Sequence, residues 1–327
     1  DDEQDTGTKQ PATTGEVSFG VDLTGFSTRV TQDGSSWNDG DKIGTYVLDM
    51  KTLEPVTEAA NVPYVCSEEG ASVSFTSTTP LKVQNDGTPV KFVAYYPYNA
   101  DVRNFNYPVQ LAAQERGSTA CDLLYAATKE EYTYSPENEP HISLNFTHRL
   151  AKVILKFVNM EKEPLEVSDV RIEGMQTAAS FNIQTDVLTV DESSVATINP
   201  YHNATTGFYE AIILPSALTD SYKVSFVLDD REKEWIFTNL DIALPQFHKV
   251  YSYTFALYID DSGFVEMGRL ENVEGGNSSP PWAARCGPCT KILSGRGRRR
   301  PYISRIPGFG APQRRYSALP RSAHHPA

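Results

Sequence analysis

The chain has 327 residues, and 39% of them are hydrophobic, which is enough apolar material for the cores of two domains. No stretch approaches the roughly 18 to 20 apolar residues of a membrane-spanning helix, so none is expected. Residues 276–327 carry ten Lys or Arg and no acid, which leaves 19 bases against 42 acids, a net charge of −23, in residues 1–275. Residues 1–275 are so acidic that they would repel the phosphate groups of a nucleic acid, and we expect no nucleic-acid partner.

The two ends of the chain differ from its body. Residues 1–15 contain no large apolar side chain, so we expect a flexible leader there. Residues 276–327 are rich in Gly, Pro and Arg and keep neither the period of a strand nor that of a helix. We therefore expect a disordered basic tail over these residues.

The body alternates with the period of a β-strand. Near the N-terminus four apolar residues fall on one face of such a strand: Val17, Phe19, Val21 and Leu23. Residues 153–158, 222–228 and 251–257 alternate in the same way, and only residues 107–128 favour a short helical turn. We predict an all-β fold of sandwiches, because an antiparallel sheet with one buried face needs a second layer.

A polar run at residues 128–140 divides the body into two halves. A long apolar strand begins beyond this run, as is typical of a new domain. We therefore predict an N-terminal β-sandwich over residues 16–143 and a C-terminal β-sandwich over residues 144–275.

Seven segments, in order, resemble the fimbrillin-like proteins of Bacteroides and its relatives. The first, STRVTQDGSSWNDGDKIGTY at residues 27–46, resembles the Thr-Arg, Trp-x-x-Gly-Asp-x-Ile-Gly signature of that family. The other six follow in the order of the family: KFVAYYPY (91–98), DLLYAAT (122–128), LNFTHRLAKVILKF (144–157), VRIEGMQTAASFNI (170–183), AIILPS (211–216) and FHKVYSYTFAL (247–257). The resemblance covers residues 17–274.

The resemblance implies two transthyretin-like β-sandwich domains and a fimbrial (pilus) subunit or adhesin on the outer surface of a bacterium. It also implies export as a lipoprotein, whose acylated Cys would lie just before Asp1 and hold the chain to the outer membrane. Other fimbrial subunits are the partners that it implies, and it brings no cofactor, metal or catalytic residue. The alternative is a surface lipoprotein that binds a host glycan or protein without polymerising.

The resemblance also implies a way of assembling. In polymerising fimbrillins a protease trims an N-terminal strand after an Arg, and the vacated groove accepts a strand from the next subunit. Here Arg29 is the candidate for cleavage, the strand from Val17 to Leu23 is the one trimmed, and residues 264–273 are the region expected to donate. The alternative is that Arg29 is an ordinary loop residue and the first strand is permanent, as in an anchor or tip subunit.

One enzymatic motif lies in the tail. Cys286 and Cys289 stand in a Cys-Gly-Pro-Cys sequence that resembles the thioredoxin active site. That chemistry needs a thiolate at the start of a helix within a βαβ unit. Here residues 278–281, Ser-Ser-Pro-Pro, replace the preceding strand, and residues 295–298, Gly-Arg-Gly-Arg, break the helix. A thiol oxidoreductase is therefore only a remote alternative, and we expect no enzyme.

Two features of the N-terminal half have more than one interpretation. Tyr95, Tyr96 and Tyr98 belong either to the core and rim of the sandwich or to a sugar-binding face. Cys66 and Cys121 form either a disulfide or two buried thiols.

Overall fold

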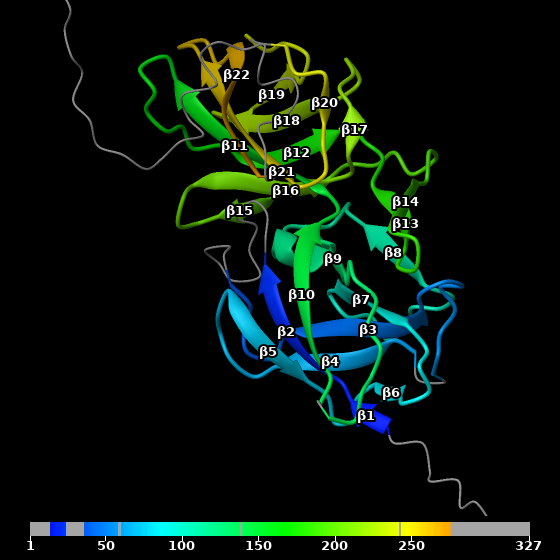
Figure 1. Cartoon of the computed structure of the whole chain (residues 1–327). Coiled ribbons are helices and arrows are strands. Elements are labelled where there is room, and N and C mark those ends of the chain that lie inside the picture. The colour runs from blue at the N-terminus through cyan, green and yellow to red at the C-terminus, as the bar shows by residue number, and fades with distance from the viewer. Residues whose placement is uncertain (1–13, 24–35, 58–59, 138, 242, 276–327) are drawn as a thin grey trace, which may run out of the picture. The chain divides into compact units, whose positions relative to one another are not determined.

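The computed structural model describes residues 14–23, 36–57, 60–137, 139–241 and 243–275. Within these ranges the chain is all-β, as the sequence predicts (Figure 1). Its one helical piece there is a 3-10 turn, η1 (Ser118–Cys121), inside the segment expected to hold a short helical turn. No helix in these ranges is long and apolar enough to cross a membrane. The expected tail, residues 276–327, and residues 1–13 of the expected leader lie outside the described residues.

The first body is a sheet of seven strands that closes on itself in the order β10-β2-β5-β4-β3-β7-β9. All neighbours are antiparallel except β2 and β10, which run parallel. A closed sheet leaves no strand edge unpaired. The strands are β2 (Ser18–Leu23), β3 (Lys42–Asp49), β4 (Val62–Cys66), β5 (Ser72–Thr76), β7 (Val90–Tyr96), β9 (Leu124–Ala127) and β10 (His141–His148). Beside them β1 (Thr14–Glu16) pairs with β6 (Lys82–Gln84).

Among the described residues, the interior of this barrel combines aliphatic side chains with six buried aromatic ones, Phe19, Trp37, Tyr64, Phe75, Phe92 and Phe146. Alternation sends every second side chain of β5 and β10 inward, and the residues between them are exposed or half-buried. Trp37 is fully buried there and packs edge-to-face on Phe75 and Phe146, with ring centroids 5.1 and 5.3 Å away. Such edge-to-face pairs add to the stability that burial alone provides.

The second body is a two-layer sandwich. One layer is a five-stranded sheet in the order β15-β16-β11-β21-β22, in which β11 and β21 run parallel. Its strands are β15 (Tyr201–Asn203), β16 (Phe208–Ile213), β11 (Ala151–Asn159), β21 (Tyr251–Ile259) and β22 (Val265–Gly275). The other layer is formed by β12 (Ser168–Glu173), β18 (Lys223–Leu228) and β19 (Arg231–Ile236). Apolar residues from both layers form one core, and a small ladder of β17 (Ser216–Ala217) and β20 (Gln246–Phe247) lies beside it.

A third sheet joins the two halves of the sequence. It consists of β8 (Asn106–Gln110), β13 (Ala178–Asn182) and β14 (Val187–Val190). Its inner residues pack with outward-facing side chains of β3 and β7 in a separate apolar cluster. Nearby, the buried side chain of Gln114 donates to the carbonyls of Leu111 and Ile212, both at 2.7 Å, and accepts from the Ile212 N–H at 2.8 Å.

The strand bounds differ from the expected segment limits in two places. Thr14 and Gly15, expected in the leader, pair with Gln84 and Val83 as part of β1. The boundary expected between residues 143 and 144 falls inside β10, all of which pairs with strands of the barrel. The division into two domains stays a prediction. Because β10 ends at His148 and β11 begins at Ala151, the predicted boundary is placed at residues 149–150.

Candidate functional site

The N-terminal strand β2 is part of the barrel wall (Figure 1). Along one edge it pairs antiparallel with β5, where Phe19 faces Phe75. Along the other edge it pairs parallel with β10, where Phe19 faces Ile142. The first strand of the barrel is therefore joined on both sides to strands that follow much later in the chain.

The inward side chains of β2 and of the residue before it are buried in the barrel core. Val17, Phe19 and Val21 are 3%, 0% and 2% exposed, and Leu23 is half-buried against the same cluster. The Phe19 ring packs edge-to-face on Tyr64 at 4.8 Å and on Phe92 at 5.9 Å. At about 1.5–3 kcal/mol for each fully buried side chain, these three contribute about 5–9 kcal/mol to holding the strand in place.

A buried tyrosine also ties the start of the strand to the barrel. The Tyr64 hydroxyl donates to the Val17 carbonyl at 2.8 Å and accepts from the Leu81 N–H at 2.9 Å. The Val17 N–H in turn donates to the Leu81 carbonyl at 2.9 Å. Burial raises the pKa of Tyr64 to about 12, so this phenol keeps the proton that it donates.

Two glycines allow close approach along the N-terminal strands. A Cβ at Gly15 would lie 2.5 Å from the Tyr134 ring, and one at Gly20 would lie 2.9 Å from the His141 imidazole. Both distances are shorter than any normal carbon contact, so only glycine fits without a shift of the neighbouring side chain.

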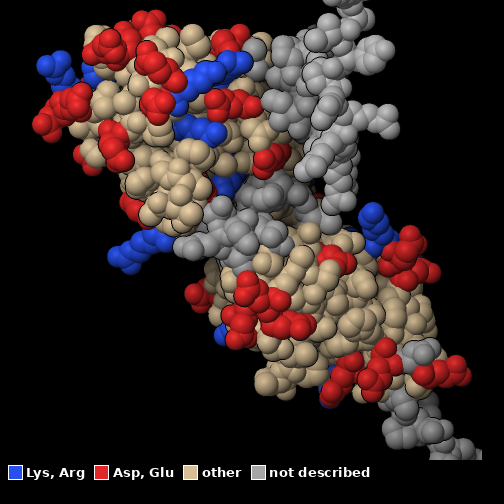
Figure 2. Space-filling view, turned by 90° about the vertical axis from the view of Figure 1, so that its left-hand side faces the viewer, with Lys and Arg blue, Asp and Glu red and all other residues tan. Residues whose placement is uncertain are grey.

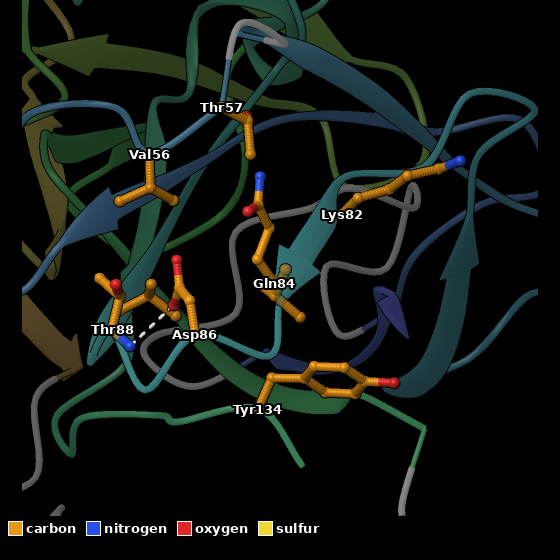
Figure 3. A pocket seen from close by; sticks show the side chains of 9 residues that line it. Val56, Thr57, Lys82, Gln84, Asp86, Thr88 and Tyr134 are labelled. Carbon is orange, nitrogen blue, oxygen red and sulfur yellow. Dashed lines mark hydrogen bonds between the residues drawn. The ribbon is translucent and has the colours of Figure 1, made fainter. Parts of the chain in front are cut away.

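A pocket of about 290 Å³ borders β6, the strand that pairs with β1. Figure 3 shows the Tyr134 ring on one side and Thr57 on the other, with Gln84 of β6 between them and Lys82 of the same strand pointing away. Asp86 accepts a hydrogen bond from the Thr88 N–H at 2.9 Å in the same wall. The partner strand of β1 is therefore accessible from this side.

Arg29 lies in residues 24–35, outside the described residues, but the chain is firmly held on both sides of that segment. Before it, β2 ends at Leu23. After it, Trp37 is buried, and its N–H and carbonyl pair with those of Gly70 at 2.8 and 3.2 Å. A turn follows in which the Asn38 N–H donates to the Asp41 carboxylate at 2.7 Å. A cut after Arg29 would therefore leave β1 and β2 held to the rest of the barrel by non-covalent contacts alone.

The expected donor region corresponds to β22, the last strand of the five-stranded sheet. The edge of β22 that does not pair with β21 forms one isolated β-bridge, between Gly268 and Leu240. Leu270 is buried, whereas Phe264, just before the strand, and Met267 are 64% and 39% exposed. The strand therefore buries fewer apolar side chains in its own body than β2 does in the barrel.

The remaining candidate residues are two pairs of cysteines and three neighbouring tyrosines. Cys286 and Cys289 lie outside the described residues. Cys66 and Cys121 are both free thiols, and burial raises the pKa of each. Of the three neighbouring tyrosines, Tyr95 is fully buried, Tyr96 is half-buried, and Tyr98 lines a surface pocket. No group of three or more His, Cys, Asp or Glu suited to a metal ion occurs within the part of the chain that the structure describes.

A closed barrel followed by packed sheets, with the first strand built into the barrel wall, defines an all-β protein. The family model described as fimbrillin-like matches residues 28–277 of this chain. The chain therefore belongs to the fimbrillin-like family, as the seven sequence segments predict.

Two solved structures show the same fold. One is a candidate cell adhesion protein of Bacteroides uniformis, with 22% identity and a TM-score of 0.62 over 80% of this chain and 96% of that one. The other is a candidate cell adhesion protein of Bacteroides ovatus, with 15% identity and a TM-score of 0.61 over 81% of this chain and 99% of that one. No curated protein matches the sequence.

Proposed function

We propose that the chain is a fimbrial subunit or adhesin on the outer surface of a bacterium and that it assembles by exchange of strand β2. The observation that supports this most is the place of β2, which is paired on both edges but separated from the rest of the barrel by the segment that contains Arg29. Membership of the family supports a surface location and other fimbrial subunits as partners, and the proposal includes export as a lipoprotein. The role is structural or adhesive, with no catalysis.

Removal of β2 would open the barrel wall between β5 and β10. Both strands would lose a hydrogen-bonded neighbour, and inward residues such as Phe75 and Phe146 would lose their cover. Unpaired backbone beside an apolar groove strongly favours addition of a new strand. A strand with apolar residues at every second position would restore both ladders if it ran in the direction of β2.

The donor in this proposal is the last strand of the next subunit, residues 264–273. These residues are at the edge of their sheet and bury few apolar side chains, so their release costs their own body less than the release of β2 costs the barrel. Residues 276–327 follow directly and bring ten positive charges, so assembly is best compared with and without them.

The test is digestion with an Arg-specific protease. The matched control is Arg29→Lys, which keeps the charge but removes the cleavage site for such a protease. We expect the cut chain to form SDS-resistant ladders on gels and filaments in electron micrographs, and the Arg29→Lys chain to stay monomeric. A chain cut at Arg29 that stays monomeric for days, with and without residues 276–327, would refute strand exchange. That result would favour a surface protein that binds a host glycan or protein without polymerising.

A further inference from the structure

A second pocket, of about 440 Å³, lies at the outer face of the barrel. Its walls come from β3, from Pro55, Ala60 and Asn61, and from the loop of residues 98–105 between β7 and β8. Three aromatic side chains line it, Tyr46, Tyr98 and Phe105, and the rings of Tyr46 and Phe105 pack 4.8 Å apart. A hollow of this size with aromatic walls is in the range of small-molecule sites.

The hydroxyl of Tyr46 has no hydrogen-bond partner within the described residues, although only 4% of the residue is exposed. The neighbouring Tyr95, by contrast, donates to the Asn61 side-chain oxygen at 2.6 Å. The fully buried polar atoms without a partner among the described residues are Trp37 Nε1 and Arg171 Nε. The Tyr46 oxygen is not one of them, so it is accessible from the pocket. Buried tyrosine hydroxyls are normally paired, so this donor is available to a ligand.

Among the described residues that line the pocket, Arg103 alone is charged. Its Nη1 donates to the carbonyls of Ala100 and Val102 at 2.7 and 2.9 Å, which fixes the guanidinium group in place. No carboxylate of the described residues forms an ion pair with it. Arg103 is itself exposed, so it offers a positive charge at the pocket of a body whose net charge is −23 and whose acids are prominent on the face shown in Figure 2.

Tyr46, Tyr98 and Arg103 line the same pocket, so their polar groups can contact one bound molecule. Burial and the neighbouring Tyr98 raise the pKa of Tyr46 to about 12, and the charge of Arg103 acts in the opposite direction. The Tyr46 phenol therefore keeps its proton and is a donor at neutral pH.

We propose that this pocket binds a carboxylate-bearing sugar. A guanidinium group and phenol hydroxyls are hydrogen-bond donors that suit a carboxylate, and the planar fork of arginine can grip both of its oxygens. The ring faces of Tyr98 and Phe105 offer apolar surface to the C–H face of a sugar ring. At the rim the exposed amide of Asn104 offers both a donor and an acceptor to sugar hydroxyls.

The test compares methyl β-D-glucuronide with methyl β-D-glucoside, which has the same ring without the carboxylate. Binding to the full chain is measured by calorimetry and by ligand-observed NMR. We expect the glucuronide to bind at least about tenfold more tightly, the lower bound for losing a hydrogen bond to a charged group. Equal binding of the two sugars, or binding of neither, would overturn the proposal. Acetate that binds as tightly as the glucuronide would also overturn it, because contacts with the sugar ring would then contribute nothing to affinity.

Two variants locate the site. Arg103→Ala is expected to lower affinity for the glucuronide about tenfold or more, whereas Arg269→Ala, which removes an exposed arginine elsewhere, is expected to leave it unchanged. Tyr46→Phe is expected to weaken binding severalfold without changing the melting temperature, because its hydroxyl has no partner in the protein. A lower melting temperature with unchanged binding would instead give Tyr46 a purely structural role. The site is independent of strand exchange, so its failure would leave the assembly proposal standing.

Discussion

Replacing Phe19 by alanine tests how strongly β2 is held in the barrel. The ring is fully buried and packs edge-to-face on Tyr64 and Phe92, so its removal loses both transfer free energy and ring contacts. Phe→Ala changes in cores lower the free energy of unfolding by about 3–5 kcal/mol. We expect a value at the upper end here, because the paired flanking strands of a closed barrel cannot move in to fill the cavity. The matched control is Phe264→Ala, the same chemical change at a side chain that is 64% exposed, for which we expect at most about 0.5 kcal/mol.

The assay is urea unfolding followed by tryptophan fluorescence. Trp37 lies in the same apolar cluster as Phe19, so it reports on the barrel. A Phe19→Ala chain that loses less than about 1 kcal/mol, or no more than the Phe264→Ala chain, would refute the claim that β2 is an integral part of the barrel core.

Three further predictions concern packing and charge. Gly268→Ala would place a Cβ 2.1 Å from the Trp235 ring, so we expect a loss of about 1–3 kcal/mol and a shift in tryptophan emission; an unchanged spectrum would contradict the contact. Lys152 and Glu210 form a buried ion pair at 2.7 Å. Lys152→Met alone is expected to cost about 3–5 kcal/mol in chemical denaturation, and adding Glu210→Gln should recover part of it, whereas purely additive losses would argue against coupling. The raised pKa of Tyr64 favours its protonated form in the folded state, so that contribution is fully present below pH 10 and lost as pH rises through about 12. The free energy of unfolding should therefore fall in this window, and a Tyr64→Phe chain that falls equally steeply would exclude this residue as a cause.

Local alternation predicted several of the strands, among them β2, β11, β18 and β21. Phe19 and Val21 face the core, as their spacing predicts, and so do Val224 and Phe226 in β18. Burial at every second position depends on a few neighbouring residues, so the local sequence is enough to predict it.

Pairing between distant strands was not predictable in the same way. The parallel contact of β2 with β10 and the β8–β13 pair join segments far apart in the chain, and no local pattern specifies the partner. The expected boundary at residues 143–144 cut through β10 for this reason.

The pocket at Tyr46 depends equally on tertiary contacts. Tyr95 and Tyr98 belong to one aromatic run, yet Tyr95 is fully buried and Tyr98 lines the pocket. Which of them faces the surface is decided by the loop of residues 98–105, where Asn104 and Phe105 take positive φ angles of 50° and 61°. No signal in the sequence indicated that the Arg103 side chain would be fixed beside Tyr46.

In strand exchange, the groove left by β2 accepts a strand from outside the chain. The most direct measurement is the mass, by light scattering, of chain cut at Arg29 and freed of its N-terminal fragment, with and without a synthetic peptide of residues 14–24. We predict that the peptide binds one to one and holds the cut chain as a monomer, and that the same peptide with Phe19→Asp leaves it free to form multimers. If both peptides give the same mass distribution, the groove does not select a strand by its buried side chains. That result would contradict assembly by strand exchange.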